Sequence, residues 1–213
     1  MSARRPPPSP PPVYAIADLD ALAPRPLPAA AAAMAEAGIR WIQLRAKRAA
    51  DAQLYPLVEA TLRAVEGSGA LVWLDDRADL AALFPVAGVH LGQRDLPPAG
   101  ARRVVGEGVW IGRSTHGEAE LAAADADLDV DLIAVGPIFP TTGKDRPDPV
   151  VGLDFLRRAR RATGKPLVAI GGIDAGNLAA VLAAGADGAA VLGAVSSGDV
   201  RAAAARLVAA AGG

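Results

Sequence analysis

Charged side chains follow several short apolar stretches of this chain, at the point where each stretch ends. Asp76 ends one such stretch, and Asp95 follows the next one. One or two carboxylates, completed by water and a substrate phosphate, are typical ligands of Mg²⁺ in proteins. Either aspartate alone could instead cap the helix that follows it. The pair, rather than one residue, therefore predicts a metal site.

Cationic side chains stand at the end of another apolar stretch. Gln43, Arg45 and Lys47 alternate, so on a continuing strand they would share one face. A planar guanidinium and an ammonium suit a polyphosphate. Lys144 adds a further cation in a Thr-Thr-Gly-Lys stretch. The alternative interpretation is that these charges are only solvated.

The elements that must position these residues alternate along the chain. Short β-type runs are predicted at 13–17, 39–45, 70–74, 88–91, 109–112, 132–135, 166–170 and 188–192. Helices are predicted at 28–37, 51–66, 78–84, 97–105, 118–126, 153–163, 177–184 and 200–210. This alternation indicates an α/β fold with a parallel sheet, and eight units predict closure into a (β/α)8 TIM barrel as a single domain, 13–213. An open doubly wound sheet is the competing fold.

Glycines after the last two runs indicate a phosphate site. Gly171 and Gly172 end the seventh run, and Gly193 follows the eighth. The loops after strands seven and eight form a recurrent phosphate site in these barrels, because glycine lets backbone N–H groups approach the anion. The alternative is ordinary turn glycine.

The two histidines have different expected roles. His116 follows Ser114 at a strand end, so it is a candidate acid or base, although plain hydrogen bonding would explain it as well. His90 lies inside a β run and is interpreted as a core histidine.

Composition excludes several classes of protein. There is no cysteine, so disulfides and thiolate chemistry are ruled out. A net charge of −1 argues against a nucleic-acid partner, and the apolar runs are too short to cross a membrane. The proline-dominated residues 1–12 lack a secretory signal and predict an extended, disordered tail. We expect a cytoplasmic protein.

Six stretches, taken in order, resemble the thiamine phosphate synthase family. They are Trp-Ile-Gln-Leu-Arg-Ala-Lys at 41–47, Asp-Asp-Arg-Ala-Asp-Leu-Ala at 75–81, Gly-Val-His-Leu-Gly-Gln-Arg-Asp at 88–95, Ile-Gly-Arg-Ser-Thr-His at 111–116, Val-Gly-Pro-Ile-Phe-Pro-Thr at 135–141 and Ala-Ile-Gly-Gly-Ile at 169–173. The resemblance runs from about residue 13 to residue 195. It is specific as an ordered set, although no single stretch is.

The resemblance implies a reaction and a set of roles. The family joins hydroxymethylpyrimidine diphosphate to a thiazole phosphate and releases diphosphate; the diphosphate is thought to leave first, so that the thiazole nitrogen captures a pyrimidine carbocation. By position, the resemblance implies Asp76 and Asp95 as ligands of a Mg²⁺ cofactor. It implies that the diphosphate is held by Arg45, Lys47 and Lys144, and that the catalytic candidates are Lys144, Arg45, Ser114 and His116. It implies substrate contacts from Gln43, Asp75 and Ser114, and from Thr141, Gly172 and Gly193 on the thiazole side. The partners would be small phosphorylated molecules, and a homodimer is a further expectation.

Three positions depart from the family pattern. Asp75 stands where Asn is usual, Gly143 where Thr is usual and Gly193 where Ser is usual. Asp75 adds negative charge near a diphosphate, so it should weaken binding unless a metal or Arg77 offsets it.

These departures keep two other functions open. Thiazole tautomerase, a relative, has a Gly-Arg-Ser-x-His stretch like 112–116, and there the histidine, here His116, shuttles a proton without a metal. Asp76, Asp95 and Gln93 favour the synthase over this relative. Asp75 and Gly143 also motivate a non-catalytic paralogue that binds a thiamine-pathway phosphate.

Overall fold

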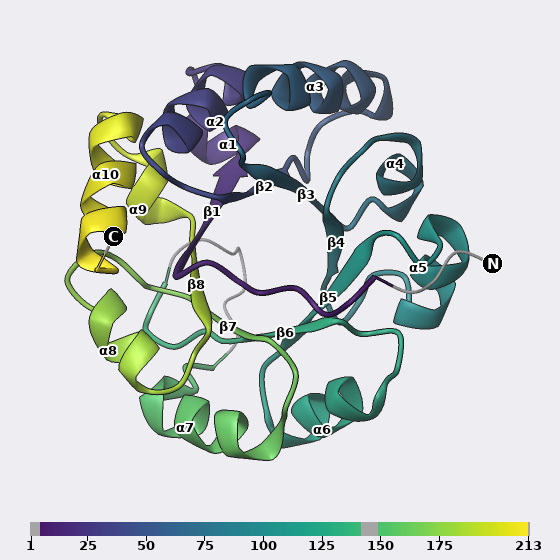
Figure 1. Cartoon of the computed structure of the whole chain (residues 1–213), viewed down its shortest axis with the longest axis vertical. Coiled ribbons are helices and arrows are strands. Elements are labelled where there is room, and N and C mark those ends of the chain that lie inside the picture. The colour runs from purple at the N-terminus through teal and green to yellow at the C-terminus, as the bar shows by residue number, and fades with distance from the viewer. Residues whose placement is uncertain (1–4, 142–148, 213) are drawn as a thin grey trace.

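Eight parallel strands close into a barrel in the order of the sequence, as predicted for a (β/α)8 fold (Figure 1). The computed structural model describes residues 5–141 and 149–212. The strands are β1 (Val13–Asp18), β2 (Trp41–Arg45), β3 (Leu71–Asp75), β4 (Gly88–Leu91), β5 (Trp110–Thr115), β6 (Leu132–Val135), β7 (Leu167–Ile170) and β8 (Gly188–Val191). β8 pairs with β1, which closes the ring.

Helices surround the strands on the outside of the ring (Figure 1). They are α1 (Leu19–Leu22), α2 (Leu27–Glu36), α3 (Asp51–Ala64), α4 (Ala78–Leu83), α5 (Pro98–Val105), α6 (Glu118–Ala126), α7 (Gly152–Ala162), α8 (Leu178–Ala183), α9 (Gly193–Ser196) and α10 (Val200–Ala210). The ranges of α6 and α10 agree with their predicted bounds. The helices α1 and α9 were missed, because four residues are too few to show a helical period.

The strand β5 is longer than its sequence predicted. Arg113 and Ser114 end the apolar run, so the strand was expected to stop at Gly112. The backbone continues instead to Thr115 and pairs Arg113 with Ile133 and Ser114 with Ala134 on β6. Ser114 is therefore a strand residue that belongs to the barrel itself, and its position is set by the sheet.

Alternate side chains of each strand divide the core in two. Outward-facing aliphatic residues pack under the helices in the larger cluster. The inner cluster holds Tyr14, Trp41, Trp73 and Trp110, whose rings lie 4.9 to 6.0 Å apart between neighbouring centroids. Aromatic rings bury large areas, so a few side chains fill the lower part of the barrel. Polar inward side chains are left for the other end.

The N-terminal segment crosses the barrel opening before it enters β1 (Figure 1). The Arg5 guanidinium lies 3.3 Å from the centroid of the Trp110 ring, and Trp110 Nε1 donates to the carbonyl of Pro6 at 2.8 Å. Ala189 N donates to the carbonyl of Pro12 at 3.0 Å. Residues 5–12, expected to be part of a disordered tail, thus have specific contacts with the end of the barrel opposite the strand C-termini. The division into a tail and a domain at residue 13 stays a prediction.

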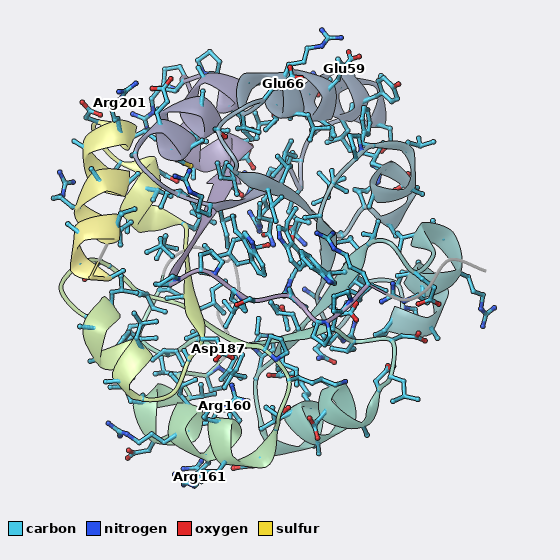
Figure 2. All side chains as sticks on the ribbon, in the orientation of Figure 1. Glu59, Glu66, Arg160, Arg161, Asp187 and Arg201 are labelled. Atoms are coloured by element: carbon cyan, nitrogen blue, oxygen red, sulfur yellow. The ribbon has the colours of Figure 1, made fainter. Side chains whose placement is uncertain are left out.

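Charged side chains cover the outer faces of the helices. The labelled Glu59 on α3, Arg161 on α7 and Arg201 on α10 all point away from the barrel (Figure 2). Within residues 5–141 and 149–212, no helix is both long enough and apolar enough to cross a bilayer.

A glycine next to the aromatic layer gives a test of this packing. A Cβ on Gly88 would lie 2.4 Å from Cζ3 of Trp73, whose indole is fully buried. We expect Gly88→Ala to lower the free energy of unfolding by about 1–3 kcal/mol, because overpacking forces ring and strand apart. Urea unfolding measures this. In the control Gly164→Ala, where the added Cβ meets nothing within 4 Å, the change should stay within about 0.5 kcal/mol. Equal effects in the two variants would contradict the packing argument.

Candidate active site

Carboxylates and cations from β1, β2 and β3 meet at the C-terminal mouth of the barrel. Arg45 Nη1 forms an ion pair with Asp18 Oδ2, and Arg45 Nε lies 3.4 Å from Asp75 Oδ2. Lys47 Nζ lies 3.3 Å from Asp75 Oδ2 and forms a hydrogen-bonded ion pair with Asp76 Oδ2. The structure thus brings together two of the three predicted cations, Arg45 and Lys47, and the predicted metal ligand Asp76.

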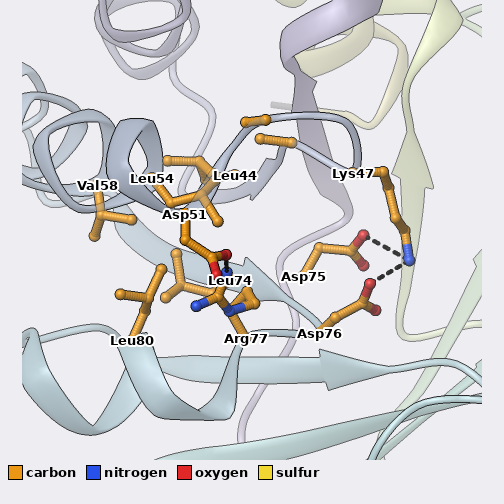
Figure 3. Close-up of a pocket in the computed structure, with 12 residues that line it drawn as sticks. Leu44, Lys47, Asp51, Leu54, Val58, Leu74, Asp75, Asp76, Arg77 and Leu80 are labelled. Carbon is orange, nitrogen blue, oxygen red and sulfur yellow. Dashed lines mark hydrogen bonds and ion pairs between the residues drawn. The ribbon is translucent and has the colours of Figure 1, made fainter.

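Arg77 does not offset the charge of Asp75. Its guanidinium binds Asp79 through Nε and Nη2 and binds Asp51 through Nη1 at 2.6 Å. These contacts lie beside a hollow of about 180 Å³ that also reaches the leucines of α3 and α4. Figure 3 shows Arg77 next to Asp51 on one side and Lys47 directed at Asp75 and Asp76 on the other. The charge of Asp75 is therefore compensated by Arg45 at the end of β2 and by Lys47, two residues later.

The backbone of Asp76 has an unusual conformation that aims its side chain. Its φ is 63°, the one positive value found at a non-glycine residue in the described ranges. Asp tolerates this left-handed region better than most residues, and such strained positions cluster at functional sites. The N–H of Asp76 donates to the carbonyl of His90 at 2.9 Å, which ties this turn to β4.

The two predicted metal ligands, Asp76 and Asp95, shift each other's pKa. Burial, the charge of Asp75 and a hydrogen bond with Asp95 raise the pKa of Asp76 to about 7. Burial tends to raise the pKa of Asp95 as well. The hydrogen bonds with Asp76 and from the backbone N–H of Gly92, at 2.7 Å, outweigh burial and lower this pKa. Two neighbouring carboxyls whose pKa values are coupled in this way form a site where a cation would be favoured.

The fit of a divalent ion is supported by an unsatisfied oxygen. Asp76 Oδ1 is buried, and no donor from residues 5–141 or 149–212 reaches it. Within the same residues, no group of three or more His, Asp or Glu side chains is arranged as a complete metal site. A cation here would thus take its protein ligands from Asp76 and Asp95 and the rest from substrate and water, which is the pattern of Mg²⁺ sites.

Two neutral residues inside the barrel are held by buried partners. Gln43 Nε2 donates to the Tyr14 hydroxyl at 3.0 Å, which fixes the orientation of this buried amide. His90 Nε2 lies 2.9 Å from Ser114 Oγ, and Gln93 Nε2 donates to the Ser114 carbonyl at 2.6 Å. The side chains of Gln43 and Ser114 are therefore oriented before any substrate arrives.

His116 lies at the end of β5 with a defined tautomer. Its ring Nδ1 is 2.6 Å from the carbonyl of Gly136, and its backbone N–H donates to Glu120 Oε2 at 2.7 Å. A carbonyl only accepts, so Nδ1 carries the proton in the neutral ring and Nε2 is the basic nitrogen. This arrangement permits proton transfer at Nε2.

Backbone groups dominate the side of the mouth formed by β7 and β8. Gly172 has a φ of 63°, and a Cβ there would lie 2.6 Å from the carbonyl oxygen of Pro140. Only glycine allows the loop after β7 to pack this closely against Pro140. Gly193 begins α9, and a Cβ there would meet nothing within 4 Å. Thr141 follows Pro140, whereas Lys144 and Gly143 lie outside the described residues.

Sequence reasoning missed three residues of the mouth. Asp18 was overlooked because β1 was expected to end at Ala17; a strand one residue longer would have placed it with the other strand-end carboxylates. Tyr14 was not singled out, and His90 was interpreted as a core histidine, but their side chains contact Gln43 and Ser114. Each contact joins two neighbouring strands, so it depends on strand register, which the sequence pattern does not give.

The raised pKa of Asp76 can be tested without any substrate. In the metal-free protein, carboxyl ¹³C NMR should show Asp76 titrating near pH 7, and Asp75→Asn should lower that pKa because Asp75 raises it. Asp79, whose pKa is lowered mainly by its hydrogen bonds with Arg77, serves as the internal control and should not move. An ordinary carboxyl pKa for Asp76 in the unaltered chain would contradict the proximity of the three carboxylates.

Comparison with known proteins agrees with this geometry. Residues 13–195 match the family described as thiamine monophosphate synthase. The thiamine-phosphate synthase of Koribacter versatilis (strain Ellin345) is 45% identical over 186 residues, 85% of this chain and 87% of the relative. That of Methanoculleus marisnigri is 45% identical over 174 residues, 81% and 82% of the two chains. The structure of thiamine phosphate pyrophosphorylase from Pyrococcus furiosus superposes with a TM-score of 0.84 at 31% identity, over 94% of this chain and 95% of that one. The chain therefore belongs to the thiamine monophosphate synthase family.

Proposed function

We propose that this chain is a thiamine phosphate synthase, a transferase that joins hydroxymethylpyrimidine diphosphate to a thiazole phosphate and releases diphosphate. The observation that carries the proposal is the meeting of the Asp76 and Asp95 carboxyls with Lys47 and Arg45 at one barrel mouth. A leaving diphosphate needs both a metal site and cations, and this mouth offers both in a chain whose family performs that reaction.

Departure of the diphosphate concentrates negative charge on the leaving group. Arg45 and Lys47 lie where they would take up that charge as the bond to the pyrimidine carbon breaks. Mg²⁺ held by Asp76 and Asp95 would neutralise a further part of it. Lys144 is assigned the same role by its position in the family pattern.

The pyrimidine is proposed to lie above the aromatic layer. Gln43 and Ser114 would bind its polar edge, because Tyr14 and His90 hold both side chains in place. Trp73 and the other inner rings close the barrel below. A dry floor of this kind keeps water from a reactive cation until the thiazole nitrogen captures it.

The thiazole phosphate is assigned to the β7 and β8 side. Gly172 and Gly193 would offer backbone N–H groups. Gly172 lets its loop pack against Phe139 and Pro140, and a Cβ on Gly193 would meet nothing within 4 Å. Thr141 stands on the adjoining loop. If only the backbone of Gly193 binds the thiazole phosphate, glycine in place of the usual serine does not weaken that contact.

The departure at Asp75 is compatible with synthase activity. Its carboxylate pairs with Arg45 and Lys47 rather than standing uncompensated. Burial raises the pKa of Asp75, and the two cations act to lower it. The non-catalytic alternative rested on Asp75 and Gly143, so the structure removes part of its support.

His116 favours thiazole tautomerase as the second candidate function. Its Nδ1 lies 2.6 Å from the carbonyl of Gly136, so Nε2 is the basic nitrogen of the neutral ring, and a proton shuttle needs such a nitrogen. The tautomerase hypothesis predicts metal-free activity that is lost in His116→Ala. A reaction without a metal does not need Asp76 and Asp95 as a pair of metal ligands, so this pair favours the synthase.

A coupled assay with both substrates tests the proposal. We expect thiamine phosphate to form only with Mg²⁺, and Asp95→Ala to lower kcat/KM by about 100-fold or more, the scale seen when a group that stabilises transition-state charge is removed. The control Asp79→Asn alters an exposed carboxylate that pairs with Arg77, away from the mouth, and should retain activity. Robust turnover in excess chelator would reject the synthase mechanism.

The metal requirement should depend on pH. Mg²⁺ binds the ionised form of Asp76, whose pKa in the metal-free protein is raised to about 7 by burial, Asp75 and Asp95. Apparent Mg²⁺ affinity should therefore fall below pH 7, by about tenfold per pH unit if one proton is displaced, and level off above it. Calorimetric titration with Mg²⁺ from about pH 5.5 to about pH 8.5 covers both sides of this pKa and measures the profile. A flat profile would show that metal binding does not displace a proton from Asp76.

The cytoplasmic location, the homodimer and the absence of a nucleic-acid partner stay predictions from the sequence.

A further inference from the structure

Asp18 has a buried carboxylate with two separate tasks. The residue is only 3% exposed and stands at the end of β1, opposite Arg45 in the β1–β2 ladder. Its Oδ1 accepts a hydrogen bond from Ala21 N at 2.9 Å and so caps α1. Its Oδ2 pairs with Arg45 Nη1. One oxygen fixes the carboxylate to the backbone, and the other oxygen holds the guanidinium.

Arg45 is held from both neighbouring strands. Asp18 on β1 binds it at Nη1, and Asp75 on β3 lies 3.4 Å from its Nε. Among residues 5–141 and 149–212, no hydrogen bond or ion pair occupies Nη2. An arginine side chain has many rotamers, and ordering it on binding would weaken the interaction with an anion. Here contacts at Nη1 and Nε order the side chain in the free protein.

We propose that Asp18 is a positioning residue that orients Arg45 for the diphosphate of the pyrimidine substrate. The inference rests on the proposed function, which gives Arg45 its ligand. Asp18 itself does not face the substrate, because its two oxygens are occupied by Ala21 and Arg45. Its effect on catalysis passes through the guanidinium, which is pre-organised for an anion that gains charge during the reaction.

The substitution Asp18→Asn separates the two tasks. Asparagine keeps an oxygen that can accept from Ala21 N, but its amide nitrogen cannot accept from Arg45. We expect the KM for the pyrimidine diphosphate and the inhibition constant of inorganic diphosphate, both with Mg²⁺, to rise about 10- to 100-fold, the scale of a hydrogen bond to a charged group. The KM for thiazole phosphate should not change.

A matched control and a double variant exclude a merely structural effect. Asp199 caps α10 by accepting from Ala202 N at 3.0 Å, so Asp199→Asn makes the same chemical change at a helix cap far from the cations. It should leave both diphosphate constants unchanged. In an Arg45→Gln background, Asp18→Asn should add little further loss, because residues that act through one another are not additive.

Three outcomes would overturn the inference. They are an unchanged inhibition constant for diphosphate in Asp18→Asn, an equal rise in the KM of both substrates, and full additivity with Arg45→Gln. If the unaltered chain makes no thiamine phosphate, the proposed function fails instead. Calorimetric titration of Asp18→Asn and the unaltered chain with inorganic diphosphate and Mg²⁺ then decides by itself whether Asp18 orients Arg45 for this anion.

Discussion

Charge compensation among β1, β2 and β3 is the interaction on which the mouth of this barrel depends. Asp18, Arg45, Asp75, Lys47 and Asp76 form an alternating series of carboxylates and cations. A buried carboxylate without a partner would be strongly destabilising, and removing one member of a buried pair leaves the other uncompensated. Each charge in the series therefore constrains the next. The barrel register brings the series together, because Asp18 lies beside Arg45 and β3 follows on the other side of β2.

The interior of the barrel is divided between a dry layer and a polar layer. Trp41, Trp73 and Trp110 fill the lower part with apolar surface, and Arg5 covers Trp110 from below. Tyr14 joins the two layers, since its ring belongs to the aromatic cluster and its hydroxyl accepts from Gln43. Burial raises its pKa well above the ordinary value, so it stays a neutral partner at any physiological pH. A neutral partner suits the proposed role of Gln43, which is to bind a neutral heterocycle.

The sequence predicted the barrel because strand runs and helices alternate eight times with few interruptions. The same pattern singled out Arg45, Lys47, Asp76 and Asp95, because each follows a recognisable apolar run; the structure places them near one another, and their roles stay predictions. What it could not predict depends on register and backbone conformation. The partners of Asp75 are set by strand pairing, so Arg77, its near neighbour in sequence, was the wrong candidate. The positive φ of Asp76 and the tautomer of His116 arise from contacts with His90 and Gly136, which no local pattern contains.

The balance of charge at the mouth supports the divalent cation in the proposed reaction. In the described residues, four carboxylates gather there, from Asp18, Asp75, Asp76 and Asp95, against Arg45, Lys47 and Arg113. Such a mouth is not a basic pocket, and a diphosphate entering alone would meet carboxylates as well as cations. Asp75, where asparagine is usual in the family pattern, sharpens this problem because it pairs with both Arg45 and Lys47. In the proposed reaction, a divalent ion bound by Asp76 and Asp95 would bring positive charge to the position where the anion would lie. Asp75 would thus make that reaction more dependent on a metal than a neutral side chain would.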